Sequence, residues 1–168
     1  AGPTATVFSF TNVSCNGLTD GNATVTVSGG TSPFTFLWSD SQTLPTATNL
    51  GAGTYTLTAT DVNGCVATTS VTISEPALLV TTLSSTDPVC FGSSNGSITS
   101  TTTGGTIGYS YLWSPGGATT SFLTGITAGT YSLQVTDANG CITLTNTTLT
   151  NPAIIASTTT TNVTCSGL

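Results

Sequence analysis

The side chains of this chain that could do chemistry are its cysteines and a few carboxylates. Its 168 residues include five Cys and six Asp or Glu, and they contain no Lys, Arg or His. The missing types supply most general bases and most of the cations that stabilise an anionic transition state. The sequence therefore predicts a protein that is not an enzyme.

The cysteines have a regular spacing. Cys15 and Cys65 lie 50 residues apart, and Cys90 and Cys141 lie 51 residues apart. We therefore predict the disulfides Cys15–Cys65 and Cys90–Cys141, with the partner of Cys165 beyond the printed sequence. Closing a loop of about 50 residues would contribute roughly 4 kcal/mol on the chain-entropy model. A zinc site is the alternative, but it would need clustered Cys and His at short spacings. Disulfides favour an oxidising, extracellular compartment.

Two carboxylates stand at equivalent places, each before an Asn-Gly pair. The residues concerned are Asp61, Asn63, Gly64, Asp137, Asn139 and Gly140. Asp hydrogen-bonds turn backbone, and Asn-Gly is typical of a two-residue hairpin turn, so we predict two such turns. Calcium is a weaker alternative, because Asp and Asn oxygens suit that ion. We expect no other cofactor. A glycosidase pair would need its carboxylates roughly 5–10 Å apart, whereas these should lie about one module apart.

The charge excludes several partners. The net charge is −6 and there is no cation, so the chain cannot neutralise nucleic-acid phosphates or bind an anionic membrane surface. No apolar run approaches the roughly 18 residues of a membrane-spanning helix, so we expect no membrane insertion. Although only 4% of residues are charged, 37% are hydrophobic, which indicates a folded chain rather than a disordered one.

The chain repeats itself. Cys15 and Trp38 recur 75 residues later as Cys90 and Trp113, while the second half of the repeat recurs 76 residues later. The one-residue slip falls after Trp38, which predicts a loop there. Self-similarity at a fixed period is typical of tandem modules.

The repeat divides the chain into three parts. We expect a first repeat at 1–76, with a linker strand at its start, and a second repeat at 77–152. Residues 153–168 would begin a third, truncated repeat.

Alternating apolar and Thr residues predict strands with one buried face. With turn signals every 8–12 residues, this favours an all-β fold of small antiparallel, immunoglobulin-like sandwiches of about 75 residues. Trp38 and Trp113 are the expected core anchors, and Tyr55 and Tyr131 the expected corner tyrosines. The phase of the strand after each Asn-Gly turn stays open.

Several motifs resemble the SprB repeat family. The first repeat carries Cys-Asn-Gly at 15–17, Gly-Gly at 29–30, Pro-Phe-Thr-Phe-Leu-Trp at 33–38 and Asp-Val-Asn-Gly-Cys at 61–65. The second repeat carries the corresponding motifs. The resemblance implies a large secreted surface protein of Bacteroidetes-type gliding bacteria, among them a mobile gliding adhesin. It also implies export by the type 9 secretion route.

The resemblance leaves three functions open. The first is the stalk of a cell-surface adhesin that extends or presents a binding tip, with neighbouring repeats as its contacts. The second is a self-assembling filament or surface-layer subunit that contacts identical chains, and the third is a module that binds surface glycans. Asn-x-Ser/Thr sequons could carry glycans; they begin at Asn12, Asn22, Asn95, Asn146 and Asn162.

The boundary between the repeats predicts a stiff array. No Gly/Ser linker of the flexible type follows Glu75-Pro76 or Asn151-Pro152. Proline fixes φ and stiffens a joint. We therefore expect the modules to sit end to end as a rod.

Overall fold

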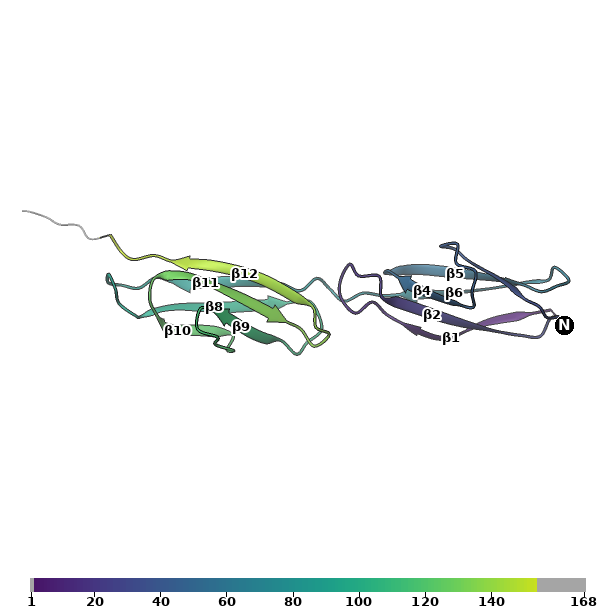
Figure 1. Ribbon diagram of the computed structural model, residues 1–168, viewed down its shortest axis with the longest axis horizontal. Helices are drawn as coiled ribbons and strands as arrows, with labels where there is room; N and C mark the ends of the chain where they lie inside the picture. The colour runs from purple at the N-terminus through teal and green to yellow at the C-terminus, as the bar shows by residue number, and fades with distance from the viewer. Residues whose placement is uncertain (1, 154–168) are drawn as a thin grey trace, which may run out of the picture.

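The computed structural model describes residues 2–153 as two β-rich modules that lie end to end along the longest axis (Figure 1). That part of the chain has twelve strands and no helix, so it has no helix long and apolar enough to cross a membrane. The all-β class predicted from the alternating pattern is confirmed.

Each module is built from six strands. In the first module they are β1 (Thr4–Thr11), β2 (Gly21–Ser28), β3 (Thr35–Trp38), β4 (Thr46–Leu50), β5 (Gly53–Thr60) and β6 (Val66–Ile73). In the second module they are β7 (Val80–Thr86), β8 (Gly96–Thr103), β9 (Ser110–Ser114), β10 (Phe122–Ile126), β11 (Gly129–Thr136) and β12 (Ile142–Leu149).

The strands of each module form two three-stranded antiparallel sheets. The orders are β1-β2-β4 and β3-β5-β6 in the first module, and β10-β8-β7 and β12-β11-β9 in the second. Because the chain changes sheet between β2 and β3, and again on either side of β4, each module is a sandwich of the immunoglobulin-like kind. No sheet contains strands from both modules.

The cores form where the alternating residues of both sheets meet. Trp38 is 2% exposed and Trp113 is 1% exposed, and each packs among buried aliphatic side chains. Their indole Nε1–H groups donate to Leu44 O and Thr120 O, both at 2.9 Å. Leu44 follows its Trp by six residues and Thr120 follows by seven. The extra residue of the second repeat therefore lies in the loop after the Trp strand.

The tyrosines of β5 and β11 stand at corners of the sandwiches. Tyr55 Oη donates to Gly51 O at 3.2 Å, and Tyr131 Oη donates to Thr127 O at 3.0 Å. A hydroxyl bonded to backbone a few residues upstream is the arrangement of a tyrosine corner. It fixes the turn that leads into each of these strands.

The phase of the last strand in each module is now defined. Val71 and Ile73 of β6 are buried, as is Leu149 of β12, whereas Ile142 and Leu144 are exposed. β6 pairs with β5 from Gly53↔Ile73 to Thr60↔Val66, which sets the inward face. The apolar residues at the start of β12 thus remain outside the core.

The prediction of two-residue Asn-Gly turns is wrong. The pairing Thr60↔Val66 leaves a five-residue loop at 61–65, and only its glycine, Gly64, has a positive φ, at 81°. The Asp61 carboxylate accepts hydrogen bonds from Asn63 N and Cys65 N at 2.9 and 2.8 Å. Gly64 N also donates to Asp61 O, and Asp61 N to Cys65 O, both at 2.9 Å, so the turn is centred on Val62 and Asn63 rather than on the Asn-Gly pair.

Candidate functional site, the joint between the modules

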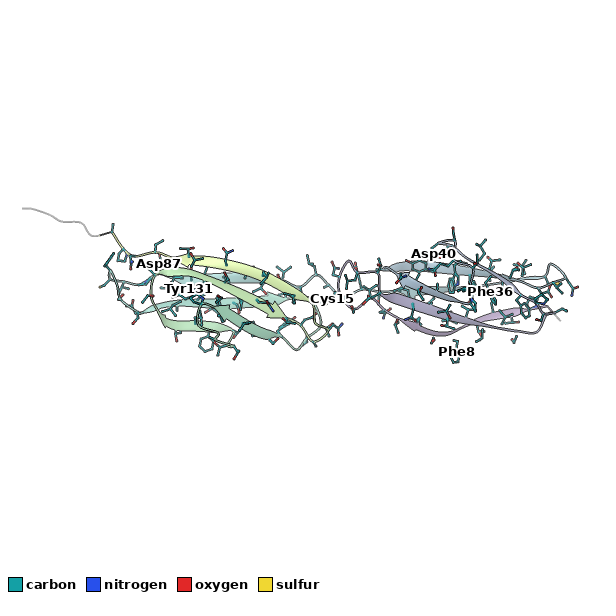
Figure 2. The ribbon with its side chains drawn as sticks, viewed as in Figure 1. Phe8, Cys15, Phe36, Asp40, Asp87 and Tyr131 are labelled. Carbon is teal, nitrogen blue, oxygen red and sulfur yellow. A yellow bond between two sulfur atoms is a disulfide. The ribbon has the colours of Figure 1, made fainter. Side chains whose placement is uncertain are left out.

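A disulfide joins the two modules. Cys15, in the loop after β1, is bonded to Cys141, just before β12, with a Cα–Cα distance of 5.7 Å across 126 residues of sequence. Figure 2 places Cys15 at the junction of the two sandwiches. The predicted pairs Cys15–Cys65 and Cys90–Cys141 are therefore wrong. Cys65 and Cys90 are exposed free thiols in this structure, and Cys165 lies outside the described residues.

The reason for the wrong pairing is the direction of the strands. Asn16, next to Cys15, donates to Pro76 O, so Cys15 lies at the end of the first module that faces the linker. The loop that carries Cys65 lies at the other end, because Gly30 has both Pro3 and the Asp61 carboxylate beside it. Eight-residue strands separate these ends by roughly 26 Å. A disulfide allows only about 7 Å between Cα atoms.

The linker is hydrogen-bonded to both modules. On the first module, Gly17 N donates to Glu75 Oε2 at 2.6 Å, and Asn16 Nδ2 donates to Pro76 O at 3.1 Å. On the second module, Gly105 N donates to Ala77 O at 2.8 Å. These contacts hold the linker at both ends.

The Gly-Gly motif of each repeat makes room for the incoming chain. Gly104 has φ of 75°, and a Cβ there would lie 1.9 Å from Leu78 O. Gly29 is the equivalent residue of the first module, and its Cβ would lie 2.8 Å from Gly2 O. Gly is the residue that tolerates both positive φ and such close backbone contact. The sequence shows this pair as a repeat signature, but its role beside the linker is visible only in the structure.

Two further contacts complete the joint. Asn139 Nδ2 of the second module donates to Ser14 O of the first at 2.9 Å. Beside the disulfide, a hollow of about 340 Å³ is lined by apolar side chains of both modules and the linker, including Leu18, Leu78 and Ile142. Ser14, Asn16, Glu75 and the linker leucines were not recognised from the sequence as members of one site.

Carboxylates position both cysteines of the disulfide. Asp137 accepts from Thr106 N at 2.7 Å and from Asn139 N and Cys141 N at 2.9 Å. The Thr106 bond, followed by those of the loop amides, holds the pKa of Asp137 below its ordinary value. On the other side, Asp20 accepts from both Ser14 Oγ and Ser14 N, and these bonds lower the pKa of Asp20.

The loop of the first module has the same carboxylate arrangement. Asp61 accepts from Cys65 N, Asn63 N and Thr31 N, and the Cys65 bond is the largest cause of its lowered pKa. Both oxygens of Asp61, like those of Asp137, thus face backbone N–H donors. Within residues 2–153, no three His, Cys, Asp or Glu side chains gather into a group that could hold a metal ion.

The fold and the joint define a class: tandem immunoglobulin-like modules with a covalent bond across their boundary. The SprB repeat family model matches residues 7–43 and 82–118, so each module has one segment similar to an SprB repeat. The resemblance drawn from the sequence motifs is confirmed. The family is one of cell-surface adhesins, so the match supports a repeat segment of the surface-adhesin type and an extracellular location.

Two solved structures resemble the chain in fold. One is described as the structural basis for Dscam isoform specificity, with 11% identity, a TM-score of 0.40, and coverage of 90% of this chain and 46% of that one. Another holds the N-terminal eight Ig domains of Down Syndrome Cell Adhesion Molecule isoform 1.30.30, with 13% identity, a TM-score of 0.41, and coverage of 90% and 25%. This chain thus spans less than half the length of either. No curated protein sequence matches it.

Proposed function

We propose that this segment is part of the shaft of a long cell-surface adhesin, in which stiff SprB repeats form a rod that extends or presents a binding tip. The observation that carries the proposal is the joint. The linker is bonded to both modules, and Cys15–Cys141 closes the joint from a second side. Two separate attachments restrict bending far more than a single linker strand does.

The side chains support a mechanical role over a catalytic one. The most strongly held carboxylates, Asp61 and Asp137, cap loops with every oxygen engaged by backbone N–H groups. Among the described residues, every buried side-chain N or O already has a hydrogen-bond partner within the protein. None of them waits for a partner that a substrate would supply. The polar groups therefore serve the fold itself.

Shape in solution tests the shaft. Small-angle scattering and electron microscopy of this segment, and of longer arrays from the same protein, should show a narrow particle that lengthens by a constant step per repeat. That step should somewhat exceed about 24 Å, the span of a seven-residue strand. Modules folded side by side, or a broad spread of joint angles between particles, would contradict the shaft.

A multi-chain filament is the second candidate, and exposed apolar side chains favour it. Phe8 is 74% exposed on β1, an edge strand, and Figure 2 shows it directed away from the sandwich. One feature of β1 opposes assembly through this edge. The register shift between Val7 and Ser9 interrupts the strand, and such bulges commonly protect edge strands against pairing with another chain. Light scattering after gel filtration separates the candidates: a concentration-independent monomer supports the shaft, and reversible assembly that Phe8→Ser abolishes supports the filament.

Gliding motility is the more particular role to test. If the parent protein is a mobile gliding adhesin exported by the type 9 route, antibodies against this segment should label moving points on live cells. Deleting the parent gene should then slow colony spreading while leaving growth unchanged. Static label with normal spreading would restrict the role to adhesion.

A further inference from the structure

The two free cysteines occupy the same places in their modules as the two bonded ones. Cys90 follows the first strand of its module as Cys15 does, and Cys65 ends the Asp-x-Asn-Gly-Cys loop as Cys141 does. The bond in this structure therefore joins the opening cysteine of one repeat to the loop cysteine of the next. Cys65 and Cys90 face outward at the two far ends of the pair of modules.

We propose that every joint of the array carries this same disulfide, so that Cys90 bonds the loop cysteine of the repeat that follows and Cys65 bonds the opening cysteine of the repeat that precedes. The occupant of each free end is thus another repeat of this type. The inference rests on the proposal that the repeats continue in tandem. It assigns Cys165, at position 15 of the pattern restarted by 161–168, to the next joint but one.

The free ends already have the groups that the joint uses. Asp61 holds the loop of Cys65 through the same three backbone bonds by which Asp137 holds that of Cys141. At the opposite end, Asn95 Oδ1 accepts from Val89 N at 3.1 Å, as Asp20 accepts from Ser14 N at 3.0 Å. Both free cysteines therefore sit in loops preshaped like the bonded ones.

One asparagine differs between the occupied and the unoccupied end. At the joint, Asn139 Nδ2 donates to Ser14 O of the neighbouring module. At the free end, its equivalent Asn63 donates to Thr31 Oγ1 of its own module at 3.0 Å. Asn63 can exchange this bond for one to a preceding repeat. The acceptor at the joint is a backbone carbonyl, so any residue in place of Ser14, such as Val89, offers it.

The free ends also leave apolar side chains uncovered. Val66 follows Cys65 as Ile142 follows Cys141, and Val89 and Phe91 flank Cys90; all three of Val66, Val89 and Phe91 are exposed. Ile142 stays 58% exposed at the present joint, so a further repeat would border this surface rather than bury it. Bond formation needs an oxidant with a disulfide of its own: two thiols become one disulfide, and the oxidant takes up two electrons and two protons as a dithiol.

A two-copy chain tests the inference. Because residues 161–168 follow the pattern of 11–18, with differences only at Thr164 and Ser166, residues 1–160 can be followed directly by residues 11–168, which keeps the natural linker. After refolding with oxidised glutathione and alkylation of remaining thiols, chymotryptic peptides are mapped by mass spectrometry without reduction. We expect Cys15–Cys141 in each copy and, in addition, a Cys90–Cys65 bond between the first copy and the second.

Matched variants assign the new bond. Cys90→Ser in the first copy should abolish the Cys90–Cys65 peptide, while Cys90→Ser in the second copy should leave it intact. The single-copy chain at the same concentration should lack it. The inference is overturned if both Cys15–Cys141 bonds form, which shows that the modules are folded, while Cys90 of the first copy and Cys65 of the second remain alkylated thiols or pair elsewhere.

Scattering on the same samples separates this inference from the proposed shaft. An extended particle without the Cys90–Cys65 bond would leave the shaft standing and reject the repeating disulfide. A strongly bent particle that does contain the Cys90–Cys65 bond would support the repeating disulfide and reject the shaft.

Discussion

At the scale of single residues, the acidic side chains act as acceptors for backbone amides. The Asp87 carboxylate accepts hydrogen bonds from Thr150 N at 2.9 Å and from Thr150 Oγ1 at 2.7 Å. These bonds connect the end of β12 to the end of β7. Its equivalent in the first module, Asn12, accepts from Ser74 N at 2.9 Å. An amide and a carboxylate are thus used at the same place, so the acceptor oxygen matters there more than the charge.

The carboxylates predict how stability depends on pH. Hydrogen bonds lower the pKa of Asp20, Asp61, Asp87 and Asp137 below 3.8 in the folded state. A lowered folded-state pKa contributes stability above the unfolded value, and that stability is lost as the pH falls through the folded pKa. We expect a free energy of unfolding that is flat between about pH 5 and 7, since the chain has no His, and that falls below about pH 4.

Urea unfolding followed by tryptophan fluorescence at a series of pH values measures this dependence. An Asp87→Asn variant serves as a control, because it restores the amide found at position 12 and should show a shallower acid limb. A loss of stability centred near pH 6 would contradict the assignment to these carboxylates.

At the scale of elements, the period-two pattern decides which side chains carry the core. Leu57 of β5 is fully buried, whereas Leu37 of the neighbouring β3 is 55% exposed. We expect Leu57→Ala to cost about 2–5 kcal/mol of unfolding free energy, because it opens a cavity between the sheets. Leu37→Ala should change it by no more than about 0.5 kcal/mol. Equal effects in denaturant titrations would show that the strand faces are assigned wrongly.

A glycine at the joint and one away from it provide a second test at this scale. Gly104 and Gly92 both have φ of 75°, but a Cβ on Gly92 meets nothing within 4 Å, whereas one on Gly104 meets Leu78 O. Gly92→Ala should therefore lower the free energy of unfolding only by the strain of a positive φ, about 1–2 kcal/mol. Gly104→Ala should cost clearly more, because the linker backbone must move.

Thermal unfolding of the two variants, with scattering to detect a displaced joint, distinguishes these costs. If Gly104→Ala is no worse than Gly92→Ala, the linker does not press on the second module as the structure has it.

At the scale of the whole molecule, the disulfide belongs to the joint and neither sandwich contains an internal one. Reduction, or the double variant Cys15→Ser/Cys141→Ser, should therefore loosen the joint while each module stays folded. We expect a wider distribution of particle lengths in scattering, with the β-type circular dichroism retained. The variant Cys65→Ser is the matched control, because it removes a cysteine outside the joint and should leave the lengths unchanged. Loss of the β signal on reduction would mean that the bond stabilises a sandwich instead.

The sequence by itself determined the class of fold, the repeat and its family, because these depend on local patterns: the alternation of apolar and Thr residues, the recurrence of Trp38 as Trp113, and the motifs shared with SprB repeats. It did not determine the phase of β6 and β12, because apolar residues occur on both faces of these strands. Nor did it show that the turns at Asp61 and Asp137 are five-residue loops held by carboxylates.

Above all, the sequence pattern predicted the wrong partners for the cysteines. Which thiols meet depends on the ends of the sandwich at which their loops lie, and on the neighbour placed there by the linker. Spacing along the chain carries neither fact, so only the tertiary structure joined Cys15 to Cys141.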